Sequence, residues 1–423
     1  MHRVLVEKKR WISEERFLHA LNYCMLLPGP EAMQLATYVG WLLHRTLGGL
    51  TAGILFVIPG FFSILALGYL YAGFQDVKII QALFFGLKPA VLAIVIEAVL
   101  RIGRRALKNR FMIAISAAAF VAIFFLNVPF PVIILFAALI GLVGGHLRPD
   151  LFPTGGHVPK DQDNKAVPFV DAFIDGYRPD QARPSFRRSL RVGSVWLLLW
   201  FGPVAALAFF LGGTHVFVQQ AVFFSKAAVV TFGGAYSVLS YVAQQAVEKF
   251  SWLRPGEMLD GLGMAETTPG PLIQVVQFVG FMGAFRDPGS LHPMLAATVA
   301  SVIVTWVTYV PCFLWIFLGA PYVEAVRGYR MLSAGLSAIT TSVVGVVLNL
   351  AIWFSLHTLF ASVEEVRWMG MRLLAPEWTT VRVPSLVLAV GAIVAMLRYR
   401  VGMLTTLACS AALGAAYHLA IEK

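Results

Sequence analysis

Residues 265–274 read Ala-Glu-Thr-Thr-Pro-Gly-Pro-Leu-Ile-Gln, and a second Pro-Gly-Pro stands at residues 28–30. Both lie inside apolar stretches, Trp252 to Phe285 and Trp11 to His44. Proline removes a backbone donor and disfavours helix before it, glycine lets the backbone turn, and a further proline suits the first position of a new helix. We therefore expect each stretch to contain two half-helices rather than one continuous helix.

The composition around these motifs is that of a membrane protein. Of the 423 residues 58% are apolar and 13% are charged, and the mean hydropathy is +0.76. Soluble domains are about 45–50% apolar and about 25% charged, so a soluble enzyme, a disordered scaffold and a nucleic-acid binder are all disfavoured. The net charge of +11 is better explained by basic loops beside a bilayer.

Segment lengths support the same conclusion, because about 20 mostly apolar residues in a helix cross a bilayer. The candidate spans are Leu47 to Gly73, Ile79 to Leu100, Phe111 to Leu126, Pro129 to His146, Val192 to Leu211, Phe217 to Val242, Met294 to Leu318, Met331 to Leu359, Val383 to Leu397 and Met403 to Leu419. The fold class expected is an all-α polytopic membrane protein.

Leu147 to Arg191 is the one long polar stretch of the sequence, and it is rich in proline and basic residues. The positive-inside tendency places it in the cytoplasm. The basic cluster from Arg101 to Arg110 lies two spans away, and so falls on the same side. We expect an N-terminal repeat at residues 1–146, a cytoplasmic linker at 147–191 and a C-terminal repeat at 192–423.

An internal repeat is the most informative feature of the chain. Val6-Glu7-Lys8, Trp11 and Pro28-Gly29-Pro30 match Val247-Glu248-Lys249, Trp252 and Pro269-Gly270-Pro271 at a constant offset of 241 residues. Further on, Gly86 to Val91 corresponds to Gly335 to Thr340. Secondary transporters are commonly built from two such halves, with the substrate site where the halves meet.

The charges suggest that the two halves are inverted. The basic cluster after Leu100 has no basic counterpart after Asn349, although two parallel copies would both place a basic loop in the cytoplasm. We expect inverted repeats with discontinuous helices.

Each Pro-Gly-Pro is expected to start a half-helix inside the membrane. Free N–H groups and the positive end of the helix dipole form an anion site there without a charged side chain. Gln34 and Gln274, in the first turns of these half-helices, could donate to an oxyanion. The alternative is that Pro-Gly-Pro only kinks a span for packing. For Phe232-Gly233-Gly234, beside Thr231, close helix packing and a further broken helix both remain open.

Ionisable residues inside spans cost roughly 2.5–3.5 kcal/mol each at the bilayer centre, so they invite a functional interpretation. Lys88, before Pro89, is the first candidate for pairing with an anion, and Lys226 and Glu266 follow. The structural alternatives are an ion pair of Lys88 with Glu97 or Glu266, and an interfacial position for Lys226. Glu266 precedes Thr267-Thr268-Pro269, and it either positions this loop or carries a proton.

These motifs together resemble the chromate ion transporter family. The resemblance rests on residues 26–36, on Gly86 to Val91, on Phe224 to Tyr236 and on Ala265 to Ile273, and it covers nearly the whole chain. It implies a bacterial inner-membrane protein of two antiparallel halves that exports chromate and confers resistance, with sulfate as a structural analogue. The candidate substrate-binding residues are Pro28, Gly29, Pro30, Gln34, Lys88, Lys226, Thr231, Phe232, Gly233, Gly234, Glu266, Thr267, Thr268, Pro269, Gly270, Pro271 and Gln274.

One feature departs from the resemblance. Family members carry a Phe-Gly-Gly helix ahead of the first Pro-Gly-Pro, whereas here His2 already aligns with Ala243. We therefore expect the first repeat to lack the equivalent of Phe217 to Val242.

The expected partners are chromate or sulfate and the lipid bilayer, without nucleic acid, and the sequence carries no signal for an oligomeric state. Cys24, Cys312 and Cys409 have no paired spacing, and no motif for catalysis, a metal or another cofactor is evident. The alternative function is a proton- or sodium-coupled importer of sulfate or another tetrahedral oxyanion.

Overall fold

The computed structural model describes residues 1–74, 77–152, 185–322, 330–368 and 370–421. Within these ranges, seven helices are long and apolar enough to cross a membrane. They comprise Glu31–Phe74, Lys78–Ala106, Phe130–Leu147, Phe186–Leu211, Pro293–Tyr322, Ser333–Leu359 and Met403–Ala420, with four shorter apolar helices beside them. The prediction of an all-α polytopic membrane protein is confirmed.

The first half of the chain contains six helical elements before the linker. These are η1 (Arg3–Lys8), α1 (Glu14–Leu26), α2 (Glu31–Phe74), α3 (Lys78–Ala106), α4 (Arg110–Phe124) and α5 (Phe130–Leu147), with a short η2 (Pro149–Leu151) after them. The backbone leaves the helical region inside α2, at His44 and Arg45. Gly40 and Gly48 then touch, since a Cβ on Gly40 would lie 2.4 Å from the Gly48 carbonyl oxygen. The label α2 thus covers a tight helical hairpin.

The second half begins with α7 (Phe186–Leu211), α8 (Val216–Val230), α9 (Ala235–Gln244), η3 (Gln245–Lys249) and α10 (Glu257–Thr267). It continues with η4 (Leu272–Gln274), α11 (Val275–Arg286), α12 (Pro293–Gly319), η5 (Ala320–Tyr322), α14 (Arg330–Leu359), α15 (Val383–Leu397) and α16 (Met403–Ile421). Helix α7 already starts inside the segment assigned to the linker, and linker residues 153–184 lie outside the described residues.

A small β-hairpin, which the sequence did not predict, stands between α14 and α15. Strands β1 (Val363–Trp368) and β2 (Met371–Pro376) pair antiparallel, and the short η6 (Trp378–Thr380) follows them. Arg372 of β2 fixes the hairpin to the helices, because its Nη2 lies 2.6 Å from Glu248 Oε1 and its backbone N–H donates to the Phe125 carbonyl.

The sequence repeat is also a repeat of backbone conformation. The π-helices η1 and η3 both end at the Val-Glu-Lys of their half. Two residues later, Arg10 and Ser251 have positive φ angles of 48° and 54°, which are uncommon for residues other than glycine. Gly29 and Gly270 have φ angles of 126° and 132°. The corresponding positions therefore share their strained conformations as well as their residue types.

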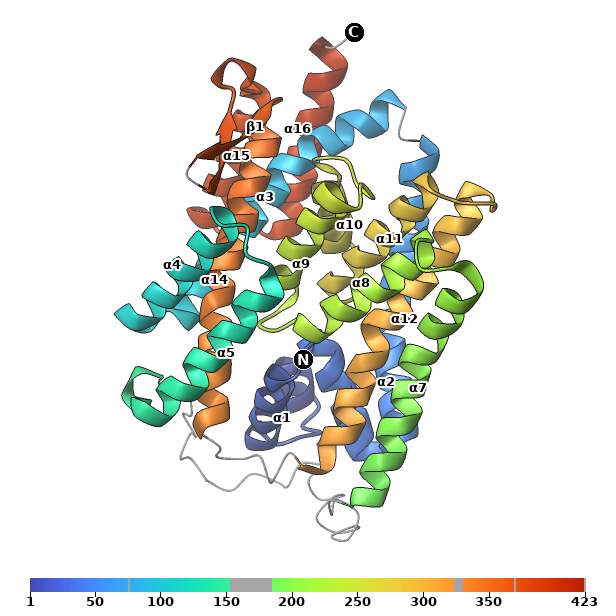
Figure 1. Cartoon of the computed structure of the whole chain (residues 1–423). Coiled ribbons are helices and arrows are strands. Elements are labelled where there is room, and N and C mark those ends of the chain that lie inside the picture. The colour runs from blue at the N-terminus through green and yellow to red at the C-terminus, as the bar shows by residue number, and fades with distance from the viewer. Residues whose placement is uncertain (75–76, 153–184, 323–329, 369, 422–423) are drawn as a thin grey trace.

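Corresponding helices run in opposite directions (Figure 1). Helix α2 ends and α3 begins at the upper end of the molecule, whereas α12 ends and α14 begins at the lower end. Helices α3 and α14 then exchange partners: α3 packs against α15 and α16, and α14 packs against α4 and α5. The two halves are inverted, and each of the two long helices is enclosed by the other half.

These exchanged contacts depend on glycine. Gly86 of α3 lies against Gly414 of α16, and its counterpart Gly335 of α14 lies against Gly141 of α5. A Cβ on Gly86 would come 2.3 Å from the Ser410 carbonyl oxygen, and one on Gly141 would come 2.5 Å from Gly335 Cα. Small residues permit such close backbone approach where the hydrophobic effect does not drive helix association.

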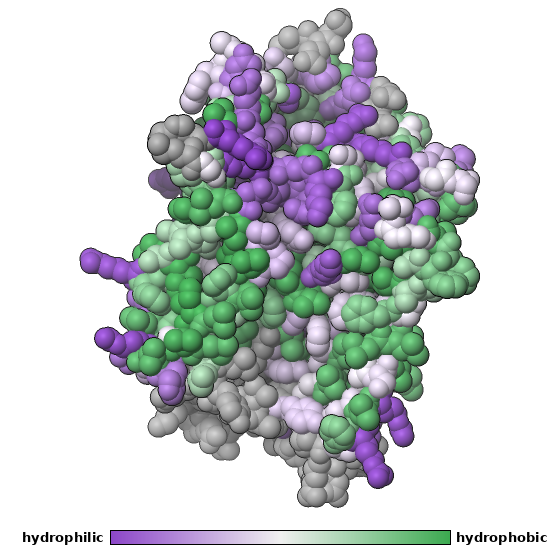
Figure 2. All heavy atoms as spheres, in the orientation of Figure 1, coloured by the Kyte–Doolittle hydropathy of each residue, from purple (hydrophilic) through white to green (hydrophobic). Residues whose placement is uncertain are grey.

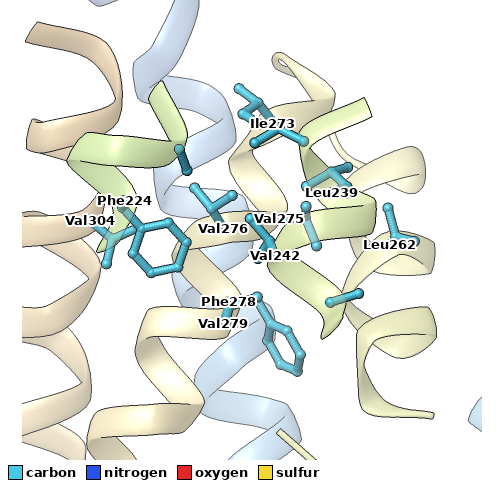
Figure 3. Close-up of a cluster of buried hydrophobic side chains, with 14 of the residues drawn as sticks. Phe224, Leu239, Val242, Leu262, Ile273, Val275, Val276, Phe278, Val279 and Val304 are labelled. Atoms are coloured by element: carbon cyan, nitrogen blue, oxygen red, sulfur yellow. The ribbon is translucent and has the colours of Figure 1, made fainter. Parts of the chain in front are cut away.

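The interior and the outer surface are both apolar. Figure 3 shows Phe278 and Val279 of α11 in one cluster with Leu239 and Val242 of α9 and Leu262 of α10. Figure 2 shows apolar side chains across the middle of one face, with polar residues gathered above them. Exposed apolar residues of α5 contribute to the outer surface: Val132, Leu135, Phe136, Leu139, Ile140 and Val143.

We predict that Gly86→Ala destabilises the fold, because the added methyl group overlaps backbone atoms that cannot rotate away. Overpacking of this kind typically costs about 1–3 kcal/mol. The measurement is the thermal unfolding midpoint in detergent. The matched control is Gly391→Ala in α15, where a Cβ meets nothing within 4 Å. Equal midpoints for the two variants would show that the glycine crossing is not needed.

Candidate functional site

Three interrupted helices meet near the centre of the molecule. The N–H of Gly29, in the break between α1 and α2, donates to the Thr231 carbonyl in the break between α8 and α9 at 2.8 Å. The Tyr236 hydroxyl, in the first turn of α9, donates to Glu266 Oε1 at the end of α10. The prediction that both Pro-Gly-Pro motifs interrupt helices is confirmed.

The Phe-Gly-Gly motif is a further break rather than a packing site within a continuous helix. Helix α8 ends at Val230 and α9 begins at Ala235, with positive φ angles at Gly233 and Gly234. The Ser237 hydroxyl donates to the Phe232 and Gly234 carbonyls. In the described part of the chain, neither the Gly233 nor the Gly234 N–H group donates a hydrogen bond. These amides are free to bind a ligand.

Each Pro-Gly-Pro rests on a proline-containing helix of the opposite half. A Cβ on Gly29 would lie 2.7 Å from Cys312 Sγ in α12, and one on Gly270 would lie 2.9 Å from Gly60 Cα in α2. Pro311 precedes Cys312 and Pro59 precedes Gly60. Sequence analysis missed both contacts, although a proline followed by a small residue inside each span was an available signal.

The two predicted glutamines are buried and already hydrogen-bonded. Gln34 Nε2 donates to the Pro28 carbonyl at 2.8 Å, which closes the first break. Gln274 Nε2 donates to Gln277 Oε1 at 2.5 Å, and Gln274 Oε1 accepts from the Tyr309 hydroxyl at 2.6 Å. Their amide N–H groups therefore position the breaks, and donation to an oxyanion would require these bonds to exchange.

The hydroxyl groups near the breaks bond back to their own helices. Thr231 donates to the Ala227 carbonyl, Thr267 to the Gly263 carbonyl and Thr268 to the Ala265 carbonyl. Such bonds satisfy the hydroxyl donors while leaving oxygen lone pairs available. Glu266 is only partly buried, and it interacts electrostatically with Arg101 and Glu97 of α3.

The structure does not bring the two predicted lysines to the breaks. Lys88 Nζ lies 3.3 Å from Asp260 Oδ2, so the expected ion pair exists but with an acid other than Glu97 or Glu266. Lys226 is exposed on the face of α8 that also exposes Val222 and Val229, as the interfacial alternative predicted. Its side chain therefore lies on the outer surface of α8.

Sequence analysis missed the buried acids of α10. Arg286 Nη2 lies 2.6 Å from Glu257 Oε1, and the Arg254 N–H donates to the other carboxylate oxygen at 2.7 Å. Asp260 is buried three residues later, in the same first turn of α10. The signal was the spacing Glu257-Met-Leu-Asp260 in an otherwise apolar stretch, because residues three apart share a helix face.

We predict that Gly29→Ala destabilises the protein and that Cys312→Gly partly restores it. The alanine is strained at a positive φ and also overlaps Cys312 Sγ, whereas the second substitution copies the Gly60 contact of the other half. Strain at such a position costs about 1–3 kcal/mol. Thermal unfolding of both single variants and the double variant measures the coupling, and strictly additive losses would contradict the contact.

Comparison with known proteins agrees with this architecture. The family model described as "Chromate transporter" matches residues 1–142 and 218–415, one segment in each half. The chain is similar to the chromate transport protein of Pseudomonas aeruginosa, with 29% identity over 82% of this chain and 73% of that protein. It is also similar to the chromate transport protein of Cupriavidus metallidurans, with 26% identity over 82% of this chain and 74% of that protein.

A third similar protein is the probable chromate transport protein of Synechococcus elongatus, with 25% identity over 82% of this chain and 76% of that protein. No solved structure matches the chain. The interrupted helices, the inverted halves and the match of the family model to both halves lead to one conclusion: the chain belongs to the chromate transporter family.

Proposed function

We propose that the protein exports chromate across the bacterial inner membrane and so confers chromate resistance. The observation that carries the proposal is the meeting of the helix breaks, fixed by the hydrogen bond from Gly29 to Thr231. The names of the similar proteins support chromate as the substrate. Sulfate, also a tetrahedral dianion, is the expected competitor.

The proposed binding groups are the backbone amides at the starts of α2, α9 and η4, the last of which leads into α11. Each helix N-terminus carries about half a positive charge, so several of them together attract a dianion. Gly29, Gly234 and Gly270 provide the turns that direct these amides inward, and the flanking prolines stop the preceding helices. Phe232 lies in the break between α8 and α9, and Glu266, Thr267 and Thr268 lie at the end of α10, so we assign them to the same site.

The membrane potential favours outward transport of the anion. A dianion that leaves an inside-negative cell gains about 2.3 kcal/mol per charge per 100 mV, or roughly 4.6 kcal/mol for two charges. Export therefore needs no coupled ion, whereas import of the same anion does. The alternative remains a proton- or sodium-coupled importer of sulfate or another oxyanion.

The proposed topology places the linker, residues 147–191, in the cytoplasm. Its basic residues support this side by the positive-inside tendency. Residues 1–146 and 192–423 then form the two transporting halves, and the inverted course of α3 and α14 supports their division.

We predict that proteoliposomes containing the protein take up labelled chromate when an inside-positive potential is imposed with valinomycin and potassium. Because the anion is drawn by the potential alone, uptake should occur without a proton or sodium gradient. Cells that express the protein should accumulate less labelled chromate than cells without it. Uptake that requires protons or sodium would instead support the importer.

We predict that Gly270→Val abolishes this flux, because valine is strained at φ 132° and displaces the break from Gly60. Gly391→Val in α15 is the control, since a Cβ there meets nothing within 4 Å. The amount of folded protein is measured beside the flux. Normal flux in a folded Gly270→Val variant would exclude the proposed binding site.

A further inference from the structure

A cavity of about 220 Å³ lies at the opposite end of α10 from the Pro-Gly-Pro break. Residues of α2, α3, α10, α14, α15 and α16 line it, so both halves contribute. Asp260 lies in the first turn of α10, about 10 Å along the helix axis from Thr267. The cavity is therefore separate from the meeting point of the three breaks.

An incompletely satisfied ion pair forms one wall. Asp260 Oδ2 accepts both from Tyr71 at 2.9 Å and from Lys88 Nζ at 3.3 Å. The Asp260 side chain is 2% exposed and that of Lys88 is 30% exposed. An ammonium group has three N–H donors, and Asp260 is the one ion-pair partner found for Lys88 in the described residues. Lys88 thus retains donors on its exposed side.

Two further polar side chains of the lining, those of Thr358 and Arg382, have no partner among the described residues. Thr358 is 4% exposed, and its hydroxyl oxygen has no hydrogen-bond partner among the described residues. Arg382, at the start of α15, forms no ion pair within the described part of the chain. Lys88 and Arg382 give the described lining two basic side chains against the single carboxylate of Asp260.

We propose that this cavity is a second oxyanion site, which takes a small dianion such as sulfate or chromate. Lys88 is shared between the anion and Asp260, Arg382 supplies the second positive charge, and the Thr358 hydroxyl donates a hydrogen bond. The two positively charged side chains of the lining would repel a metal cation. The inference rests on the proposed function, because it gives the transported anion a second binding site at the end of α10 that lies away from the Pro-Gly-Pro break.

Because Lys88 is shared between Asp260 and the anion, substitutions of these two residues should change the affinity for the anion in opposite directions. Asp260→Asn keeps the shape of the side chain but releases Lys88, so the anion gains the full charge of the ammonium group. Lys88→Gln removes that charge. A purely structural ion pair would instead make both substitutions weaken the protein in the same way, because each leaves an unpaired buried group.

The test is equilibrium binding of labelled sulfate and labelled chromate to the purified full chain in lipid nanodiscs. We expect the dissociation constant of the cavity site to rise about tenfold in Lys88→Gln and in Arg382→Gln, and to fall several-fold in Asp260→Asn. Lys78→Gln is the control, because it removes an exposed positive charge from the same helix outside the cavity.

The double variant Asp260→Asn/Lys88→Gln separates folding from binding. It removes both charges, so its unfolding midpoint should recover while anion binding stays as weak as in Lys88→Gln. If the unmodified protein binds neither anion, the proposed function fails together with this site. If it binds them, but Asp260→Asn and Lys88→Gln shift binding in the same direction or leave it unchanged, the second site alone is refuted.

Discussion

The hydrogen bond from the Gly29 N–H to the Thr231 carbonyl is the contact on which the arrangement of the centre depends. A peptide group inside a bilayer must find a partner within the protein, and every helix break exposes several such groups. This protein satisfies part of them by placing one break against another, and by bonding Gln34 to the Pro28 carbonyl. The N–H groups of Gly233 and Gly234 are then left without a hydrogen bond among the described residues.

Local chemistry explains which parts of this arrangement were predictable from the sequence. Proline and glycine act on their own backbone, so both Pro-Gly-Pro breaks were predicted at the right residues, whereas Phe217 to Val242, predicted as one span, is divided between α8 and α9. The contact of Gly29 with Cys312, and that of Lys88 with Asp260, join helices far apart in the sequence. Span length and hydropathy carry no information on such pairs. The β-hairpin was missed because its strands are short and contain charges.

The two ion pairs of α10 differ in how completely they are satisfied. Glu257 uses both carboxylate oxygens, one with Arg286 and one with the Arg254 N–H, and Arg286 also donates to the Trp252 carbonyl. Such saturation suits a fixed structural role, which holds the start of α10 against the end of α11. Asp260 leaves Oδ1 without a partner in the described residues, although desolvation makes an unpaired buried oxygen costly. The unsatisfied pair is the one that faces the cavity.

The two inverted halves share the glycines at which helix backbones touch, but they differ in their charged residues. Gly86 and Gly335 keep the same crossing, whereas Lys88 corresponds to Ser337 and carries its charge in one half alone. An inverted repeat lets the two halves exchange similar conformations about a shared site. This exchange requires the same helix packing in both halves, but it does not require the same charged residues. Unequal charges change how tightly an anion binds from each side of the membrane. They cannot set the direction of net flux, because an uncoupled anion moves down its electrochemical gradient, which depends only on the anion concentrations and on the membrane potential. The asymmetry therefore acts on affinity and rate, and the direction of flux follows from the electrochemical gradient of the anion.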